Sequence, residues 1–111
     1  MGLSTHVLDL VTGQPARDVS VSVSLNGKEI KRDKTNDDGR CADLLDGGSL
    51  EKGIYKLTFQ AGSYLRTTHP GEGEAPFFDV IDIQFTVSDT GRHYHVPLLL
   101  SPYGYSTYRG S

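Results

Sequence analysis

The sequence of 111 residues has one cysteine, no long hydrophobic run and no excess of basic residues. Cys41 has no internal partner for a disulfide bond, and a single cysteine excludes a Cys-rich metal framework. The longest apolar run, residues 96–100, contains Pro97 and is far shorter than the ~20 residues that a membrane-spanning helix needs. The formal net charge is −3, and no basic stripe favours nucleic acid. We therefore expect neither a membrane nor a nucleic-acid partner.

The first residues lack the features of a targeting segment. Residues 1–6 contain no basic stretch followed by a long apolar one, so they do not predict a secretory signal. The Met1-Gly2 start resembles a myristoylation site, but that pattern requires Ser or Thr where His6 stands. The expected location is the cytoplasm, and a periplasmic or organellar leader that has already been removed is the alternative.

Length and composition are typical of one ordinary domain over residues 1–111, with 36% hydrophobic and 23% charged residues. Surface scaling predicts that about two-thirds of the surface of the unfolded chain is buried on folding. That is enough for one core but too little for a barrel with a roomy interior. Any deep site is therefore expected at a mouth, an edge or a subunit boundary.

Alternating apolar and polar residues predict a chain made mostly of β-strands. Residues 18–25 alternate with a period of two, which places four apolar side chains on one face. Asn26-Gly27 follows directly and is a strong hairpin signal, so residues 28–35 would form the returning strand. The remaining predicted elements are a short helix at 61–68 and strands at 4–10, 41–45, 53–60, 77–88, 92–101 and 103–109.

About eight short strands at this spacing predict an all-β sandwich of two antiparallel sheets. Pro97 inside the predicted strand 92–101 prefers an edge or a position that donates no hydrogen bond. The tyrosine-rich residues 103–111 have little linker character, so we expect this tail to be held against the domain.

The candidates for chemistry are histidines and arginines. His93 and His95 lie two apart on one predicted strand and therefore share a face, and His6 lies on the first strand. With His6 as a third ligand this pair could hold zinc, whereas a lone strand histidine is usually solvated or satisfied by its neighbours. Arg40 follows a turn and could be a solvated arginine, and it adjoins Cys41. An adjacent cation would lower the pKa of that thiol, yet a strand cysteine is more often a small buried hydrophobe.

Four segments carry a resemblance to a known family. They are residues 3–9 (Leu-Ser-Thr-His-Val-Leu-Asp), 38–41 (Asp-Gly-Arg-Cys), 93–103 (His-Tyr-His-Val-Pro-Leu-Leu-Leu-Ser-Pro-Tyr) and 108–111 (Tyr-Arg-Gly-Ser). Over essentially its whole length, the chain resembles the 5-hydroxyisourate hydrolases, transthyretin-related enzymes of purine catabolism. The ending Tyr-Arg-Gly-Ser is that family's signature and separates it from the hormone carriers. The resemblance implies a transthyretin-like sandwich of two four-stranded antiparallel sheets with one short helix.

The resemblance also implies a substrate and site residues. The substrate is 5-hydroxyisourate, whose six-membered ring is opened to 2-oxo-4-hydroxy-4-carboxy-5-ureidoimidazoline without a metal or cofactor. His6 and His95 are then the acid–base pair, with His95 preferred over His6 for activating water, and Arg40 binds the substrate and stabilises negative charge. Tyr108, Arg109 and Ser111, through its hydroxyl or the terminal carboxylate, would clamp the ring or orient the water. His93 is expected to be a neighbour of the catalytic pair.

The family resemblance implies a homotetramer, a dimer of dimers with sites in the cleft where two dimers meet. Two alternatives stay open at this point. One is a transthyretin-like carrier that holds a small ligand without turnover. The other is a zinc hydrolase whose ligands are His6, His93 and His95.

Overall fold

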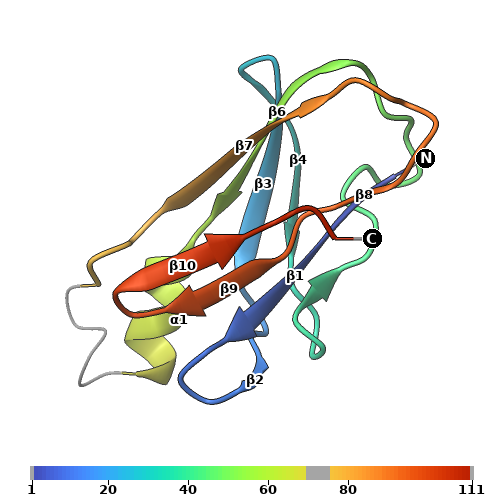
Figure 1. Cartoon of the computed structure of the whole chain (residues 1–111). Helices are drawn as coiled ribbons and strands as arrows, with labels where there is room; N and C mark the ends of the chain where they lie inside the picture. Colours follow the sequence, from blue (N-terminus) through green and yellow to red (C-terminus); the bar gives the residue numbers. More distant parts are fainter. Residues whose placement is uncertain (1, 70–75, 111) are drawn as a thin grey trace.

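The computed structural model describes residues 2–69 and 76–110 and shows ten β-strands and one helix within them (Figure 1). The strands lie in two sheets. The elements in chain order are β1 (Leu3–Asp9), β2 (Gln14–Pro15), β3 (Ser20–Leu25), β4 (Lys28–Lys34), β5 (Arg40–Cys41), β6 (Gly53–Phe59), α1 (Ala61–Thr68), β7 (Ile81–Val87), β8 (Tyr94–His95), β9 (Leu98–Ser101) and β10 (Gly104–Thr107). The all-β sandwich with one short helix that the sequence predicts is thereby confirmed.

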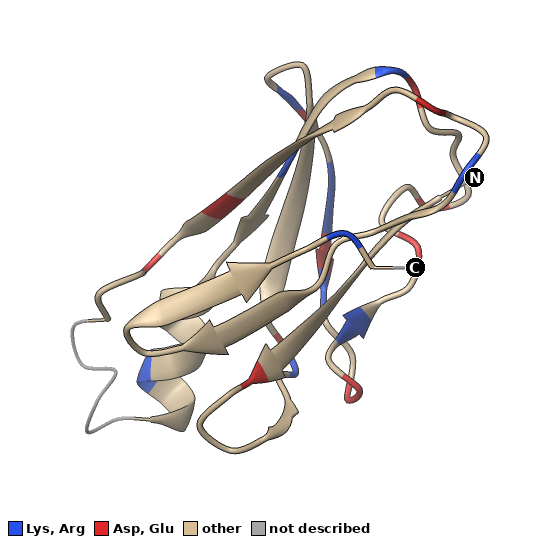
Figure 2. Ribbon diagram, viewed as in Figure 1, with Lys and Arg blue, Asp and Glu red and all other residues tan. Residues whose placement is uncertain are grey.

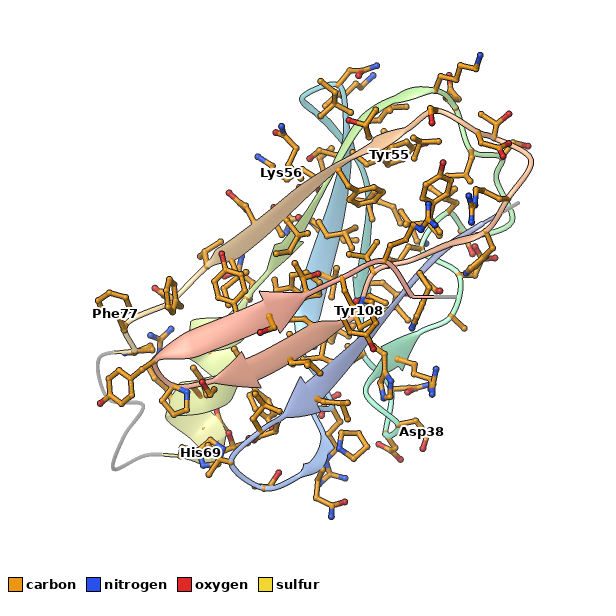
Figure 3. All side chains as sticks on the ribbon, in the orientation of Figure 1. Asp38, Tyr55, Lys56, His69, Phe77 and Tyr108 are labelled. Atoms are coloured by element: carbon orange, nitrogen blue, oxygen red, sulfur yellow. The ribbon has the colours of Figure 1, made fainter. Side chains whose placement is uncertain are left out.

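The four-stranded sheet has the order β4-β3-β6-β7, with every neighbouring pair antiparallel. The hairpin between β3 and β4 turns at Asn26 and Gly27, which both have positive φ, as this turn requires. Alternation along β6 turns Tyr55 into the interior, where its side chain is 1% exposed, whereas Lys56 points away from the sandwich (Figure 3). The alternating pattern therefore identifies the core face of this sheet correctly.

The second sheet is organised around β1. Its first half lies between β8 and β5, and its second half lies between β9 and β2, with β10 beyond β9. This sheet therefore has six strands, where the resemblance implies four. The pairs of β1 with β8 and with β9 are parallel, which also departs from a purely antiparallel sheet.

The structure corrects three predicted strands. Of the strand predicted at 41–45 only Cys41 lies in a strand, as the last residue of β5, because a turn stabilised by the Asp43 carboxylate follows it. The strand predicted at 77–88 begins at Ile81. The strand predicted at 92–101 is divided into β8 and β9 at Val96-Pro97, since proline has no N–H to continue the ladder.

The core lies between the two sheets and combines aliphatic side chains with a few rings. Tyr55 and Phe85 stack with their centroids 5.8 Å apart, and Phe85 stacks on Tyr94 from the other sheet at 6.4 Å. The single cysteine, Cys41, is buried in this core. Its thiol pKa is raised to about 12 by burial and by the charge of Asp33, so the buried structural role, and not a reactive thiol beside Arg40, is confirmed.

The helix α1 covers one end of the sandwich and is tied to β1 by Asp9. This carboxylate is 1% exposed and accepts hydrogen bonds from Tyr64 Oη and His69 Nε2, both at 2.7 Å. The amides of Val11 and Thr12 donate to the same carboxylate. We call this group the Asp9 cluster, and Figure 3 places His69 beside α1. No helix among the described residues is long and apolar enough to cross a membrane.

Candidate active site

The first two candidate residues lie opposite each other on neighbouring strands. His6 on β1 is the direct partner of Arg40 on β5 in an antiparallel pair. Directly opposed residues place their side chains on the same face, with Cβ atoms about 5 Å apart. Their neighbours Thr5 and Cys41 form the next pair and are buried, so His6 and Arg40 occupy the outer face of this sheet. Residues 34 positions apart in the sequence are thus brought together.

The position of Arg40 depends on the turn that precedes it. The side-chain oxygen of Asn36 accepts hydrogen bonds from the amides of Asp38 and Arg40, each at 3.0 Å. Gly39 has φ +73°, and its carbonyl accepts a hydrogen bond of 2.7 Å from the amide of Val7 on β1. A Cβ atom at Gly39 would lie 2.5 Å from the Val7 carbonyl oxygen. Only glycine therefore allows the turn to approach β1 this closely.

His95 reaches the same face from the far side of β1. It is the partner of Ser4 in the parallel pair of β8 with β1, and Ser4 and His6 are two residues apart on one strand. Alternation therefore places Ser4, His6, Arg40 and His95 on one face of the sheet. The Oγ atom of Ser4 lies 2.8 Å from Nδ1 of His95 and 2.7 Å from Nε2 of His93.

Burial and a neighbouring cation both favour neutral imidazoles in this group. Burial lowers the pKa of His95, and the charges of Arg40, His6 and His93 lower it further. Burial and then the charge of Arg40 lower the pKa of His6, although the backbone and charge of Asp38 act in the opposite direction. At neutral pH both rings are therefore held in the form that can accept a proton.

A hollow of about 250 Å³ opens at this face. It is lined by Ser4, Thr5, Arg40, Ala42, His93 and His95. Two rings and a guanidinium around a small hollow are suited to a planar, polar ligand, because the guanidinium can bind a carbonyl edge while imidazole exchanges protons. The arrangement can thus activate water and stabilise an oxyanion at one place.

The C-terminal segment is attached to the site through its backbone. The amide of Gly110 donates a hydrogen bond of 2.7 Å to the carbonyl of His95. A Cβ atom at Gly110 would lie 2.6 Å from Cδ2 of the His95 ring, so the glycine packs directly against this imidazole. The expectation that the tail is held against the domain is confirmed for residues 104–110.

Of the four predicted substrate-binding residues, only Arg40 lines this hollow. His6 shares the face with Arg40 but is not part of the lining. Tyr108 and Arg109 are exposed and line a different hollow, of about 290 Å³, together with β7 residues and Tyr94. Figure 3 shows Tyr108 beyond the end of β10. Ser111 lies outside the described residues, so its predicted role stays a prediction.

Sequence reasoning missed two residues of the site, Ser4 and Gly110. Ser4 could have been found, since it lies two residues before His6 and alternation places both on one face. Gly110 carries no side chain, and only the fold shows its contact with His95. Within the described part of the chain, no three His, Cys, Asp or Glu side chains are placed to hold a metal ion, so the geometry gives the zinc alternative no support.

Fold and site together define a class of protein: transthyretin-like sandwiches with a histidine–arginine site on the outer face of one sheet. The family model described as "HIUase/Transthyretin family" matches residues 3–110, and the chain belongs to this family.

Individual relatives are similar over nearly the whole chain. The chain is 47% identical to a 5-hydroxyisourate hydrolase of Ralstonia nicotianae, covering 98% of this chain and 97% of that protein. The solved structure of Klebsiella pneumoniae 5-hydroxyisourate hydrolase is 39% identical, covers 100% of both chains and has a TM-score of 0.86. Sea bream transthyretin in complex with thyroxine is 28% identical with a TM-score of 0.85, covering 99% of this chain and 95% of that one. The fold is thus common to both proteins, while the sequence is closer to the hydrolase.

Proposed function

We propose that this protein catalyses the hydrolysis of 5-hydroxyisourate to 2-oxo-4-hydroxy-4-carboxy-5-ureidoimidazoline, a step of urate degradation. The observation that carries the proposal is the convergence of His6, Arg40 and His95, from three distant segments, on one face of one sheet. The 47% identity to a relative named for this reaction supports the same conclusion.

The proposal gives each of these residues a role that its geometry supports. The Nδ1 atom of His95 is bonded to Ser4, and among the described residues none hydrogen-bonds Nε2, so Nε2 is the atom that takes a proton from water. The oxygen of that water bonds to the ring carbonyl carbon, and Arg40 stabilises the negative charge that develops on the carbonyl oxygen. The C–N bond of the six-membered ring then breaks. The proton that His95 took from water reaches the leaving nitrogen through His6, whose neutral ring accepts a proton on one nitrogen and donates one from the other. One proton leaves water and one reaches nitrogen, so both rings end neutral.

A turnover assay tests the proposal. With 5-hydroxyisourate generated enzymatically in the cuvette, the protein should accelerate loss of its ultraviolet absorbance beyond the spontaneous rate. His95→Ala and Arg40→Glu should each lower the catalysed rate by roughly 10²- to 10³-fold while the fold persists. Arg32→Glu is a matched control, because Arg32 is an exposed strand arginine of the other sheet.

Two outcomes would reject the assignment. Near-normal turnover in either site variant would remove the named residue from the mechanism. Thyroxine binding by the wild-type protein without any turnover would favour a carrier.

The assembly belongs to the same proposal: the protein is a dimer of dimers. The strands β7 and β10 each lie at one edge of their sheet, opposite the edges formed by β4 and β2, and an edge strand offers unpaired backbone groups. The hairpin of β9 and β10 carries no charged residue, as Figure 2 shows, and the hollow lined by Tyr108 and Arg109 lies between these two edges. A second copy of the chain covering this region could bring Tyr108 and Arg109 to a shared substrate cleft. Their expected role of clamping the substrate ring requires this. Light scattering should give four times the mass of one chain.

The cytoplasm is proposed as the location. The single cysteine, Cys41, is a buried free thiol, so the fold uses no disulfide bond within the chain. This supports the proposal, because proteins of reducing compartments rarely depend on disulfide bonds.

A further inference from the structure

Ser4 lies on the catalytic face, between two histidine rings. Its hydroxyl is within hydrogen-bond distance of His95 Nδ1 at 2.8 Å and of His93 Nε2 at 2.7 Å. Ser4 is 8% exposed, so within the described structure these two rings are its side-chain partners in place of bulk water. His93 itself is exposed. The three side chains form a continuous chain of contacts along the wall of the hollow, from the half-buried His95 ring to the exposed His93 ring.

The chemistry of a hydroxyl restricts how this chain of contacts can be bonded. A serine has one proton to donate and can accept others, so it donates to one ring and accepts from the second. In the first arrangement Ser4 accepts from Nδ1–H of His95 and donates to Nε2 of His93, which leaves Nε2 of His95 free as a base. In the second arrangement both hydrogen bonds are reversed, and Nε2 of His95 carries the proton. Reversing the direction of both hydrogen bonds therefore converts His95 from the tautomer whose Nε2 can accept a proton to the tautomer whose Nε2 can donate one.

The surroundings of the two rings differ in how well they tolerate a positive charge. His95 is half-buried and faces the Arg40 guanidinium from β5 and the His6 ring from β1, and these neighbours disfavour an imidazolium there. His93 is exposed to water, which solvates a cation. A proton taken up at His95 is therefore more stable after it has been transferred outward to His93.

We propose that Ser4 and His93 form a proton relay that holds His95 in its Nδ1–H tautomer and accepts the proton that His95 takes from water. The proposal deepens the hydrolase function and rests on it, and it makes Ser4 and His93 positioning residues. As Nε2 of His95 takes a proton from water, the Nδ1 proton moves to Ser4 Oγ and the Ser4 proton moves to His93 Nε2. His93 then releases its Nδ1 proton to solvent, so His95 is neutral throughout.

The relay runs backwards when the ring of the substrate opens. Nε2 of His95 gives up its proton, directly or through His6, to the nitrogen of the broken C–N bond. Nδ1 of His95 then recovers a proton from Ser4, Ser4 recovers one from His93 Nε2, and His93 recovers one from solvent. Every proton released in the first half of the reaction is replaced in the second, and no other reactant is needed.

The first test needs no substrate. Nuclear magnetic resonance of ¹⁵N-histidine-labelled protein distinguishes a protonated ring nitrogen from an unprotonated one. Neutral His95 should be protonated at Nδ1 in the wild type. In Ser4→Ala this preference should be lost, because the His95 ring then has no hydroxyl beside Nδ1 to select that tautomer. Ser24→Ala, a matched strand serine in the other sheet, should leave His95 unchanged.

The second test is kinetic. Ser4→Ala and His93→Ala should each lower kcat by about 10- to 10²-fold, the usual cost of losing a partner that orients a functional histidine, with little change in KM. Ser4→Thr keeps the hydroxyl and should restore most of the activity lost in Ser4→Ala. Added imidazole should raise kcat of His93→Ala, since His93 is exposed and a free base can take its place.

Each result has a distinct meaning. An unchanged His95 tautomer in Ser4→Ala overturns the relay, even if the variant is less stable, because a merely structural serine would leave the tautomer alone. Wild-type kcat in His93→Ala, or a loss that imidazole does not rescue, also overturns it. A wild-type protein that fails to hydrolyse 5-hydroxyisourate overturns the proposed function instead, and the tautomer measurement separates the two failures.

Discussion

Arg40 affects both imidazoles of the site, and its charge has a consequence for the pH range of activity. Burial is the largest cause of the low pKa of His95, and the Arg40 charge is the next. A base that is protonated cannot accept a proton, so a lowered pKa extends activity to more acidic pH.

Replacing the guanidinium should therefore move the acid limb of the pH profile. In Arg40→Met the pKa of His95 should rise towards its ordinary value of 6.5, and the loss of kcat/KM on acidification should begin at higher pH. Nuclear magnetic resonance titration of the His95 ring protons gives the pKa even if the variant is too slow to assay. An identical titration in wild type and variant would show that the Arg40 charge does not lower this pKa.

Gly110 shapes the site without a side chain of its own. In Gly110→Ala the new Cβ would lie 2.6 Å from the His95 ring, so the ring or the tail must move. Because a displacement of about 1 Å can cost on the order of 10²-fold in rate, we expect a large loss of kcat with little loss of stability. Gly104→Ala is the control, since its Cβ would be 3.7 Å from the nearest atom. Equal activity in both variants would contradict the packing role.

At the level of elements, the turn before β5 determines where Arg40 lies. Gly39→Ala should destabilise the fold by roughly 1 kcal/mol from its left-handed backbone, and by a further 1–3 kcal/mol from the clash with the Val7 carbonyl. Gly13→Ala is an informative comparison, because Gly13 has nearly the same φ, +72°, and open space around its Cβ position. Chemical denaturation measures the free energy of unfolding of both variants. Equal values for Gly39→Ala and Gly13→Ala would mean that the turn at Gly39 can shift to relieve the clash without loss of stability.

The elements also show what the sequence can and cannot predict. The helix is found at the expected residues 61–68, and the β3–β4 hairpin turns at the expected Asn26-Gly27. Local patterns decide both features. The strand expected at 41–45 is short and the one expected at 92–101 is divided, because a turn hydrogen bond and a proline outweigh alternation.

Local sequence patterns predict less of the candidate site than of the fold. The shared face of His93 and His95 follows from alternation, and both rings indeed reach Ser4. The meeting of His6 with Arg40 depends on the pairing of β1 with β5, which no local pattern specifies, and only the family resemblance pointed to it. Tyr108 and Arg109 line another hollow of the single chain, so their predicted place in the site depends on assembly.

Across the whole molecule, the Asp9 cluster connects the end of β1 to α1. Burial opposes ionisation of Asp9, but the hydrogen bonds from His69, Tyr64 and the two amides together lower its pKa. A carboxylate whose pKa is lower in the folded state stabilises the fold above its unfolded pKa, near 4, and this contribution is lost as the pH falls through the folded value.

Asp9→Asn should therefore lower the free energy of unfolding at neutral pH by about 1.5–3 kcal/mol, the typical value of hydrogen bonds to a charged group. The difference between wild type and variant should shrink below pH 4, where Asp9 itself becomes neutral. Urea denaturation at several pH values gives these energies. A constant difference across the range would exclude ionisation of Asp9 as the cause.

The central place of β1 has a consequence for biosynthesis. This strand is made well before β8 and β9, which lie some ninety residues later in the chain, yet it pairs in parallel with both. Contacts so distant in sequence cannot form until the late strands have left the ribosome, and such long-range pairing is slow. A nascent chain stalled before residue 94 would contain His6 and Arg40 but have no His95 opposite Ser4. Catalysis therefore begins only at the last stage of folding.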